Sequence, residues 1–160
     1  MVEAIPLIPK PRLPPLTTRR CSALMDIASR SPGLGCQGLL GRFLDNYLVA
    51  ESLATKLQYY YQVDTGQKST DKIHVNQLIA AQRHFSLAFE DLRTKEIFLS
   101  GAGTGGCKSC RQLRNGYVHS LCVSDREEIE KRSKSLLIDL VDYLESYRSL
   151  CSPIRGGRAI

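Results

Sequence analysis

The sequence predicts an all-α protein, a four-helix bundle with a proline-rich extension at its N-terminus. Apolar residues recur at three- and four-residue steps over most of residues 38–150, and clusters of turn-forming residues separate these stretches. An alternating strand pattern is suggested only by EIFLS at residues 96–100. With 160 residues, 42% of them apolar, the chain has material for one domain with a single core. Amphipathic helices of this kind bury their apolar faces against one another in a bundle.

The two ends of the chain differ in composition from the middle. Six of the seven prolines lie within residues 1–32, which favours polyproline II or disorder. We therefore expect residues 1–36 to form a flexible basic arm, with folded structure beginning near Gly38. The helical domain is expected over residues 37–152, and residues 153–160 are expected to form a disordered basic tail.

The four helices follow from the periodicity. The first is predicted over residues 38–62 and is ended by the turn formers of residues 64–71. A second helix has its apolar face formed by Leu78, Ala81, Phe85, Ala88 or Phe89, and Leu92. A short third helix is predicted over residues 107–120. The fourth is expected to begin at a capping box of Ser124 and Glu127. Its apolar stripe consists of Ile129, Leu136, Leu140, Leu144 and Tyr147.

Hydropathy and charge restrict the class of protein. The longest clean apolar runs span three or four residues, whereas a helix that crosses a bilayer needs about 20; we expect no membrane protein. The N-terminal region lacks the apolar stretch of a signal peptide, so the six cysteines are expected in a reduced, cytoplasmic setting.

The net charge is +6, and residues 93–114 carry five basic residues and one acidic one. Such a basic patch is typical of proteins with a phosphate-rich partner.

A glycine-rich segment raises the first of three possible chemistries. Gly101, Gly103 and Gly106 match GxGxxG, a pattern that cradles phosphates between a strand and a helix. However, the βαβ unit of a dinucleotide-binding fold is missing. If the segment is compared with a P-loop instead, Lys108 comes one residue late. A flexible linker explains these glycines more simply.

A cysteine and histidine pattern raises the second possibility, a small zinc-binding protein. The pattern is C-x2-C-x8-H-x2-C, and its members are Cys107, Cys110, His119 and Cys122. Such a set can close a tetrahedral zinc site. Its spacing is not that of a common zinc knuckle, and the alternative is a set of ordinary half-buried thiols.

The string RNGYVH at residues 114–119 (the RNGYVH motif) is the third possibility. Asn115 and His119 are four residues apart, so a helix places them on one face, with Arg114 next to Asn115. A guanidinium can clamp two phosphate oxygens, and an imidazole can exchange a proton near neutral pH. The motif therefore indicates a site for a phosphodiester.

In its context, the RNGYVH motif resembles the signature of the HEPN superfamily (higher eukaryotes and prokaryotes nucleotide-binding). That signature is R-x4–6-H with a polar residue, often Asn, directly after the Arg. The resemblance covers roughly residues 38–150, with two long helices before the motif and one after it. It implies a metal-independent endoribonuclease of toxin or phage-defence type that needs no cofactor and cleaves RNA through attack of the ribose 2′-hydroxyl. The implied partners are RNA, a second copy of the chain that completes the site, and an antitoxin or regulatory protein.

The resemblance also assigns roles. His119 would be the general acid and base, Arg114 would stabilise charge on the scissile phosphate, and Asn115 would orient that phosphate or the imidazole. We expect further RNA contacts from Lys108, Arg111 and Tyr117. Superfamily toxins that are modified by a nucleotidyltransferase antitoxin carry a tyrosine two residues after the histidine, where this chain has Leu121. Many members bind nucleotides or proteins without turnover, so a non-catalytic RNA- or protein-binding module is the alternative.

Overall fold

A computed structural model describes residues 16–31, 38–100 and 107–156. These residues form six helices and no strand, which confirms the all-α class. The helices are α1 (Thr18–Ala28), α2 (Leu39–Thr65), α3 (Val75–His84), α4 (Asp91–Phe98), α5 (Cys110–Ser120) and α6 (Val123–Gly156). Within the described ranges, no helix has both the length and the apolarity of a membrane span.

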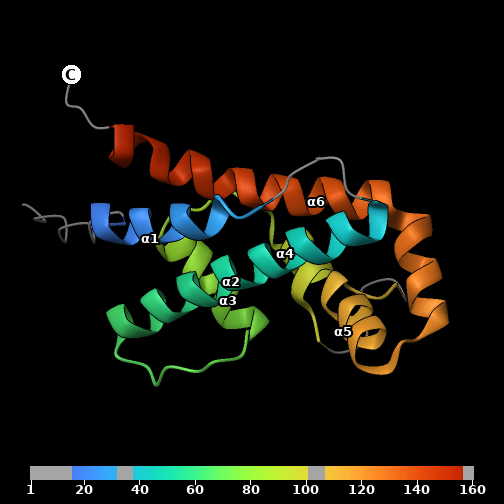
Figure 1. The fold of residues 1–160 in the computed structure, drawn as a ribbon. Coiled ribbons are helices and arrows are strands. Elements are labelled where there is room, and N and C mark those ends of the chain that lie inside the picture. The colour runs from blue at the N-terminus through green and yellow to red at the C-terminus, as the bar shows by residue number, and fades with distance from the viewer. Residues whose placement is uncertain (1–15, 32–37, 101–106, 157–160) are drawn as a thin grey trace, which may run out of the picture.

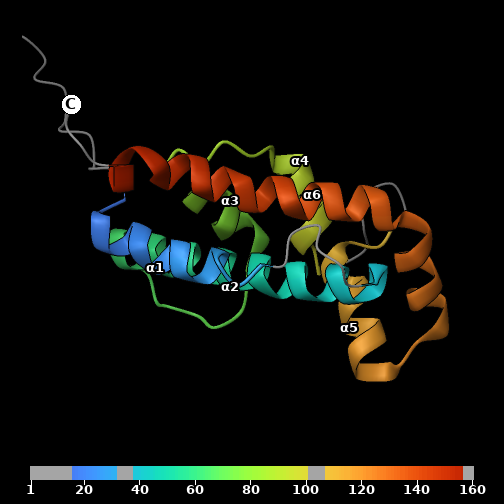
Figure 2. The ribbon, with the colours of Figure 1, turned by 45° about the horizontal axis from the view of Figure 1, so that its top comes forward.

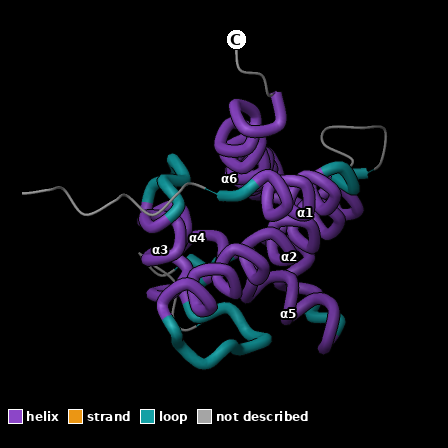
Figure 3. Tube along the Cα trace, turned by 90° about the vertical axis from the view of Figure 1, so that its left-hand side faces the viewer, coloured by secondary structure: helices purple, strands orange, loops and turns teal. Residues whose placement is uncertain are grey.

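The two longest helices, α2 and α6, pack side by side and run in the same direction, and α1 packs against both in the opposite direction (Figure 1). Helices α3 and α4 lie on the other side of α2 and α6 from α1 (Figure 3). The first turns of α6 run at a steep angle to its remainder and lie beside α5 (Figure 2). Helix α5 is therefore held between α2, α4 and the start of α6.

The core between these helices contains buried tyrosines whose hydroxyl groups are satisfied. The Tyr143 hydroxyl donates to Oε1 of Gln82 at 3.0 Å and lies 2.6 Å from the Tyr147 hydroxyl. Nε2 of Gln82 donates in turn to Oγ1 of Thr94 at 2.9 Å. Burial raises the pKa of both tyrosines above the ordinary value, so both rings remain neutral. This chain of bonds joins α3, α4 and α6 inside the core.

Helix α1 corrects the prediction that residues 1–36 form a flexible arm. The Thr17 side chain caps the helix by accepting a hydrogen bond from the backbone N–H of Arg20 at 3.2 Å. The core side chains of this segment are Leu16, Cys21, Leu24, Met25 and Ala28. Residues 16–31 contain no proline, so the composition of the flanking sequence concealed an amphipathic helix. Residues 1–15 lie outside the described residues.

An ion-pair cluster fastens α1 to the ends of α2 and α3. Arg20 donates two hydrogen bonds to the Asp64 carboxylate, at 3.0 and 2.9 Å, and Nε2 of His84 lies 3.1 Å from the same carboxylate. The Arg20 guanidinium also lies over the Tyr60 ring, 4.5 Å from its centroid. The hydrogen bond from Arg20 is the main reason that the pKa of Asp64 is lower than usual.

We expect Asp64→Asn to lower the free energy of unfolding by about 1–2 kcal/mol at neutral pH, because charge-assisted bonds to α1 are lost. Since the folded protein depresses the pKa of Asp64, this stabilisation is fully present above the unfolded pKa of about 4. It is lost as the pH falls through the folded value. Urea unfolding of wild type and variant should therefore converge at acidic pH. Asp71→Asn, at an exposed position, is the matched control, and an equal loss there would contradict the assignment.

The predicted second helix is two helices, α3 and α4. The chain turns between them at Ser86, which has a φ of 59° in the left-handed region. Phe85 and Leu87 on either side of it are buried, so their apolar pattern belongs to a packed turn and not to a helix face. The residues 96–100 considered as a strand belong largely to α4, which ends at Phe98.

The starts of α5 and α6 also differ from the prediction. The capping box lies at α5, where the Ser109 hydroxyl accepts from the Gln112 backbone N–H at 3.1 Å and the Gln112 side chain accepts from the Ser109 N–H at 2.9 Å. Helix α6 begins at Val123, so Ser124 lies inside its first turn. The tail predicted as disordered over residues 153–160 begins inside α6.

Candidate functional site

The RNGYVH motif lies on α5, so the predicted helical placement of Asn115 and His119 is confirmed. Cys110 and Leu113 are buried and anchor the helix to the core. Leu121 caps the C-terminus of the helix; its φ of 48° is left-handed, and its backbone N–H donates to the Tyr117 carbonyl at 2.9 Å. The second half of α5 thus carries the motif beyond the buried part of the helix.

Arg114 is held between its neighbour Asn115 and a ring of α2. Nη1 of Arg114 donates to Oδ1 of Asn115 at 2.8 Å, and the guanidinium carbon lies 5.8 Å from the centroid of the Tyr47 ring. Tyr47 is fully buried and its hydroxyl donates to Oε2 of Glu51 at 3.0 Å. Burial, with Glu51 beside it, raises the pKa of Tyr47 above its usual range. The half-buried guanidinium therefore rests on a fixed, neutral ring.

His119 is exposed in the last turn of α5. It is five residues from Arg114, which corresponds to about 7.5 Å along the axis and a rotation of roughly 140°. The two side chains therefore leave the helix in different directions, whereas Arg114 and Asn115 are in contact. Exposed apolar side chains surround the end of α5, namely Val118, Leu121 and Val123.

The other predicted RNA-contacting residues take part in interactions within the fold. Nζ of Lys108 lies 2.6 Å from Oδ1 of Asp125, and this hydrogen bond raises the pKa of Lys108. Nη1 of Arg111 donates to a carbonyl just before α3 at 3.0 Å and to one at the end of α4 at 3.3 Å. Tyr117 is half-buried against the core. Their contact with RNA stays a prediction.

The basic stretch of residues 93–114 is largely paired inside the protein. Arg93 forms ion pairs with two aspartates of α6, with Asp139 at 2.7 Å and with Asp142 at 2.8 Å. Among the five basic residues of this stretch, only Lys95 finds no ion pair or side-chain hydrogen bond in the part of the chain that the structure describes. The charge count in the sequence therefore overstates the net positive charge that this stretch presents to a ligand.

The proposed zinc ligands are not brought together. Cys110 is buried at the start of α5 and burial raises the pKa of its thiol, while His119 is exposed near the other end of the helix. At about 1.5 Å per residue, the two lie roughly 13 Å apart along the axis. Across the described ranges, no group of three or more His, Cys, Asp or Glu side chains is placed to hold a metal ion. The glycines of residues 101–106, considered for a phosphate loop, lie outside those ranges.

Asp125, a residue that the sequence pattern does not single out, positions the motif. This residue is 4% exposed in the first turn of α6, and its carboxylate packs against Gly116 of the RNGYVH motif. A Cβ atom added at Gly116 would lie 1.7 Å from Oδ2 of Asp125. With Lys108 on its other oxygen, Asp125 ties the start and the middle of α5 to α6. The available signal was a glycine inside a helical segment, where it costs about 1 kcal/mol relative to alanine.

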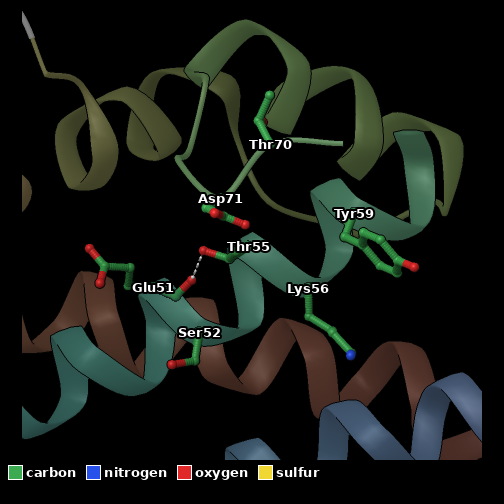
Figure 4. A pocket seen from close by; sticks show the side chains of 7 residues that line it. All are labelled: Glu51, Ser52, Thr55, Lys56, Tyr59, Thr70 and Asp71. Carbon is green, nitrogen blue, oxygen red and sulfur yellow. Dashed lines mark hydrogen bonds between the residues drawn. The ribbon is translucent and has the colours of Figure 1, made fainter. Parts of the chain in front are cut away.

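A hollow of about 420 Å³ opens between α2 and the segment before α3. It is lined by Glu51, Ser52, Thr55, Lys56, Tyr59, Thr70 and Asp71. Figure 4 shows Asp71 facing α2, and it shows the Lys56 side chain extending away from Asp71. Glu51 connects this hollow to the motif, because it accepts the hydrogen bond of Tyr47 beneath Arg114.

Comparison of the chain with protein-family models, with curated proteins and with solved structures finds no match in any of the three. A functional conclusion therefore depends on α5 and the residues that position it.

Proposed function

We propose that the protein is a metal-independent endoribonuclease of the HEPN type that acts through Arg114, Asn115 and His119. The observation that supports this most directly is the Arg114 guanidinium, fixed by Asn115 and Tyr47 on a helix whose last turn exposes an imidazole. A preorganised guanidinium loses little conformational freedom when it binds a phosphate. An imidazole exchanges protons near neutral pH. Together they provide anion stabilisation and proton transfer for cleavage by the 2′-hydroxyl.

In this proposal each of the three residues has its own role. Arg114 neutralises the scissile phosphate, and His119 takes the proton of the 2′-hydroxyl or donates one to the leaving 5′-oxygen. Asn115 acts on the guanidinium, since its Oδ1 accepts a hydrogen bond from Arg114. Because Arg114 and His119 leave α5 in different directions, we propose that two copies of the chain face each other and that each site combines groups from both. Helices α2, α3, α5 and α6 would then correspond to the four-helix bundle of this superfamily.

A non-catalytic protein-binding module is the second candidate. The side chains of Val118, Leu121 and Val123 favour it, because they are apolar, exposed and close to His119 in the sequence. A regulatory protein such as an antitoxin could cover the motif there. This candidate predicts binding without RNA cleavage.

The deciding experiment is RNA cleavage by the purified protein in excess EDTA. Cleavage should persist, because no step of the proposed reaction uses a metal ion. Arg114→Gln should slow it by about 10²-fold, as expected when one anion-stabilising donor is lost. Asn115→Ala should slow it less, and the double variant should be no slower than Arg114→Gln alone, because Asn115 acts through Arg114.

Arg30→Gln, at an exposed position outside α5, is the control for the loss of one arginine charge. If cleavage stops when EDTA is added, the metal-independent mechanism is excluded. Fully additive losses at Arg114 and Asn115 would mean that Asn115 acts on RNA or on the imidazole. Intact RNA in all reactions would favour the binding module.

A further inference from the structure

A cavity of about 240 Å³ lies at the end of α5 that is opposite to His119. It opens between α4, the start of α5 and α6, and its lining includes Lys95, Glu96, Cys107, Lys108, Ser109 and Arg132. Three of these residues are cations and one is a carboxylate, and the cations come from three separate segments. Pockets for drug-sized ligands measure about 300–1,000 Å³. The volume therefore suits a ligand smaller than a typical drug molecule.

The cations around this cavity still have donors for a ligand. Lys95 has no hydrogen-bond or ion-pair partner among the described side chains. The Lys108 side chain is 52% exposed and shares its ammonium group with Asp125. Arg132 donates through Nη1 to the Lys108 carbonyl at 2.9 Å, which fixes its guanidinium at the start of α5, and its Nε lies 3.8 Å from Glu128. A guanidinium has further N–H groups beyond these.

The start of α5 adds to this positive potential. Ser109 is the N-cap of the helix and also lines the cavity. The N–H groups of Ser109 and Gln112 are already bonded within the capping box, and the helix dipole is positive at this end of α5. The cavity, the cations that line it and the helix dipole thus favour the same kind of ligand, a compact anion with several oxygen acceptors.

We propose that this cavity binds a phosphate monoester dianion, held by Lys95, Arg132 and Lys108 at the start of α5. Two negative charges and three terminal oxygens can engage cations that arrive from three directions, which a single carboxylate group cannot. Inorganic phosphate and organic monoesters share this chemistry. The site is separate from the RNGYVH motif and does not depend on ribonuclease activity.

Cys107 allows the proposal to be tested, because its exposed thiol lines the cavity. The full-length protein is alkylated with iodoacetamide at constant ionic strength, and the modification of each cysteine is followed by mass spectrometry. With a dissociation constant on the order of 1 mM, about 10 mM inorganic phosphate should slow alkylation of Cys107 roughly tenfold. Cys122, at the other end of α5, should react at an unchanged rate. Adenosine monophosphate should protect as phosphate does, and adenosine should not.

Matched variants separate this site from general charge effects. Lys95→Gln should reduce the protection of Cys107 to less than about twofold. Lys131→Gln removes the same charge from an exposed position of α6 that does not line the cavity, so protection should remain. At about 10 mM, phosphate should also raise the melting temperature of wild type and of Lys131→Gln by about 3–6 °C, but not that of Lys95→Gln.

Three results would overturn the proposal. The first is an unchanged rate at Cys107 in phosphate, even if the melting temperature rises, because phosphate would then bind elsewhere. The second is equal protection by adenosine, which carries no phosphate. The third is an equal loss of protection in Lys95→Gln and Lys131→Gln, which would show that only net charge matters.

Discussion

His119→Gln should cleave RNA about 10²–10⁴ times more slowly than the wild type and bind RNA with nearly the same affinity. Glutamine keeps a hydrogen-bonding group at this position but cannot exchange a proton near neutral pH. Proton transfer contributes to the rate of cleavage and little to the binding of intact RNA. Because His119 is exposed, the free energy of unfolding should change by less than about 0.5 kcal/mol.

The chain provides a matched control in His74→Gln. His74 is also exposed and lies at the N-cap of α3, where its side chain makes no capping bond. Single-turnover cleavage of a labelled RNA should therefore be unaffected by this change. Wild-type cleavage rates in His119→Gln would eliminate the proposed mechanism, and unfolding of the variant would assign His119 a structural role.

A mixture of two slow variants tests whether each site is shared between two protomers. If each site takes Arg114 from one protomer and His119 from its partner, a mixed dimer of Arg114→Gln and His119→Gln has one intact site. Half of the dimers in an equal mixture are mixed, so activity should return to about a quarter of the wild-type value. A mixture that stays inactive would mean that one protomer supplies both groups or that no dimer forms.

Much of the helical architecture could be predicted because it follows from local periodicity. The predicted stripe on α6 is buried throughout, from Ile129 to Tyr147, and the first predicted helix matches α2 within a few residues. Helix α1 was missed because the arm was judged by the overall composition of residues 1–36, which is rich in proline. Residues 16–31 contain no proline and include this helix. The break between α3 and α4 was missed because a turn with buried residues on both sides of Ser86 continues the apolar pattern of a helix.

The candidate site was predictable only where sequence neighbours form it. A spacing of four residues places Asn115 and His119 on one helical face, and no other information is required. The contact of Arg114 with Tyr47 joins residues from α5 and α2, and it leaves no pattern in either segment. The same holds for Lys108 and Asp125, whose pairing offsets one positive charge of the apparent basic patch. Ion pairs between distant segments are invisible to a local count of charge.

Gly116→Ala should destabilise the protein by about 3 kcal/mol, although alanine is the better helix former by about 1 kcal/mol. The added Cβ would lie 1.7 Å from Oδ2 and 2.9 Å from Cγ of Asp125, and that carboxylate is buried and paired with Lys108. Relief of the clash would displace the carboxylate from its partner or move α5 away from α6. The steric term therefore exceeds the helix propensity, and urea unfolding should show a loss of stability. RNA cleavage should fall as well, because α5 carries Arg114 and His119.

The Asp125→Ala background separates this contact from a general intolerance of α5. Asp125→Ala alone should cost about 1–3 kcal/mol through loss of the pair with Lys108. In that background the nearest remaining atom of residue 125 is its Cβ, 3.6 Å from the added methyl group, which is an ordinary contact distance. Gly116→Ala should then raise stability by up to about 1 kcal/mol, as helix propensity dictates. An equal loss in both backgrounds would mean that the approach of Asp125 is not the reason for a glycine within the RNGYVH motif.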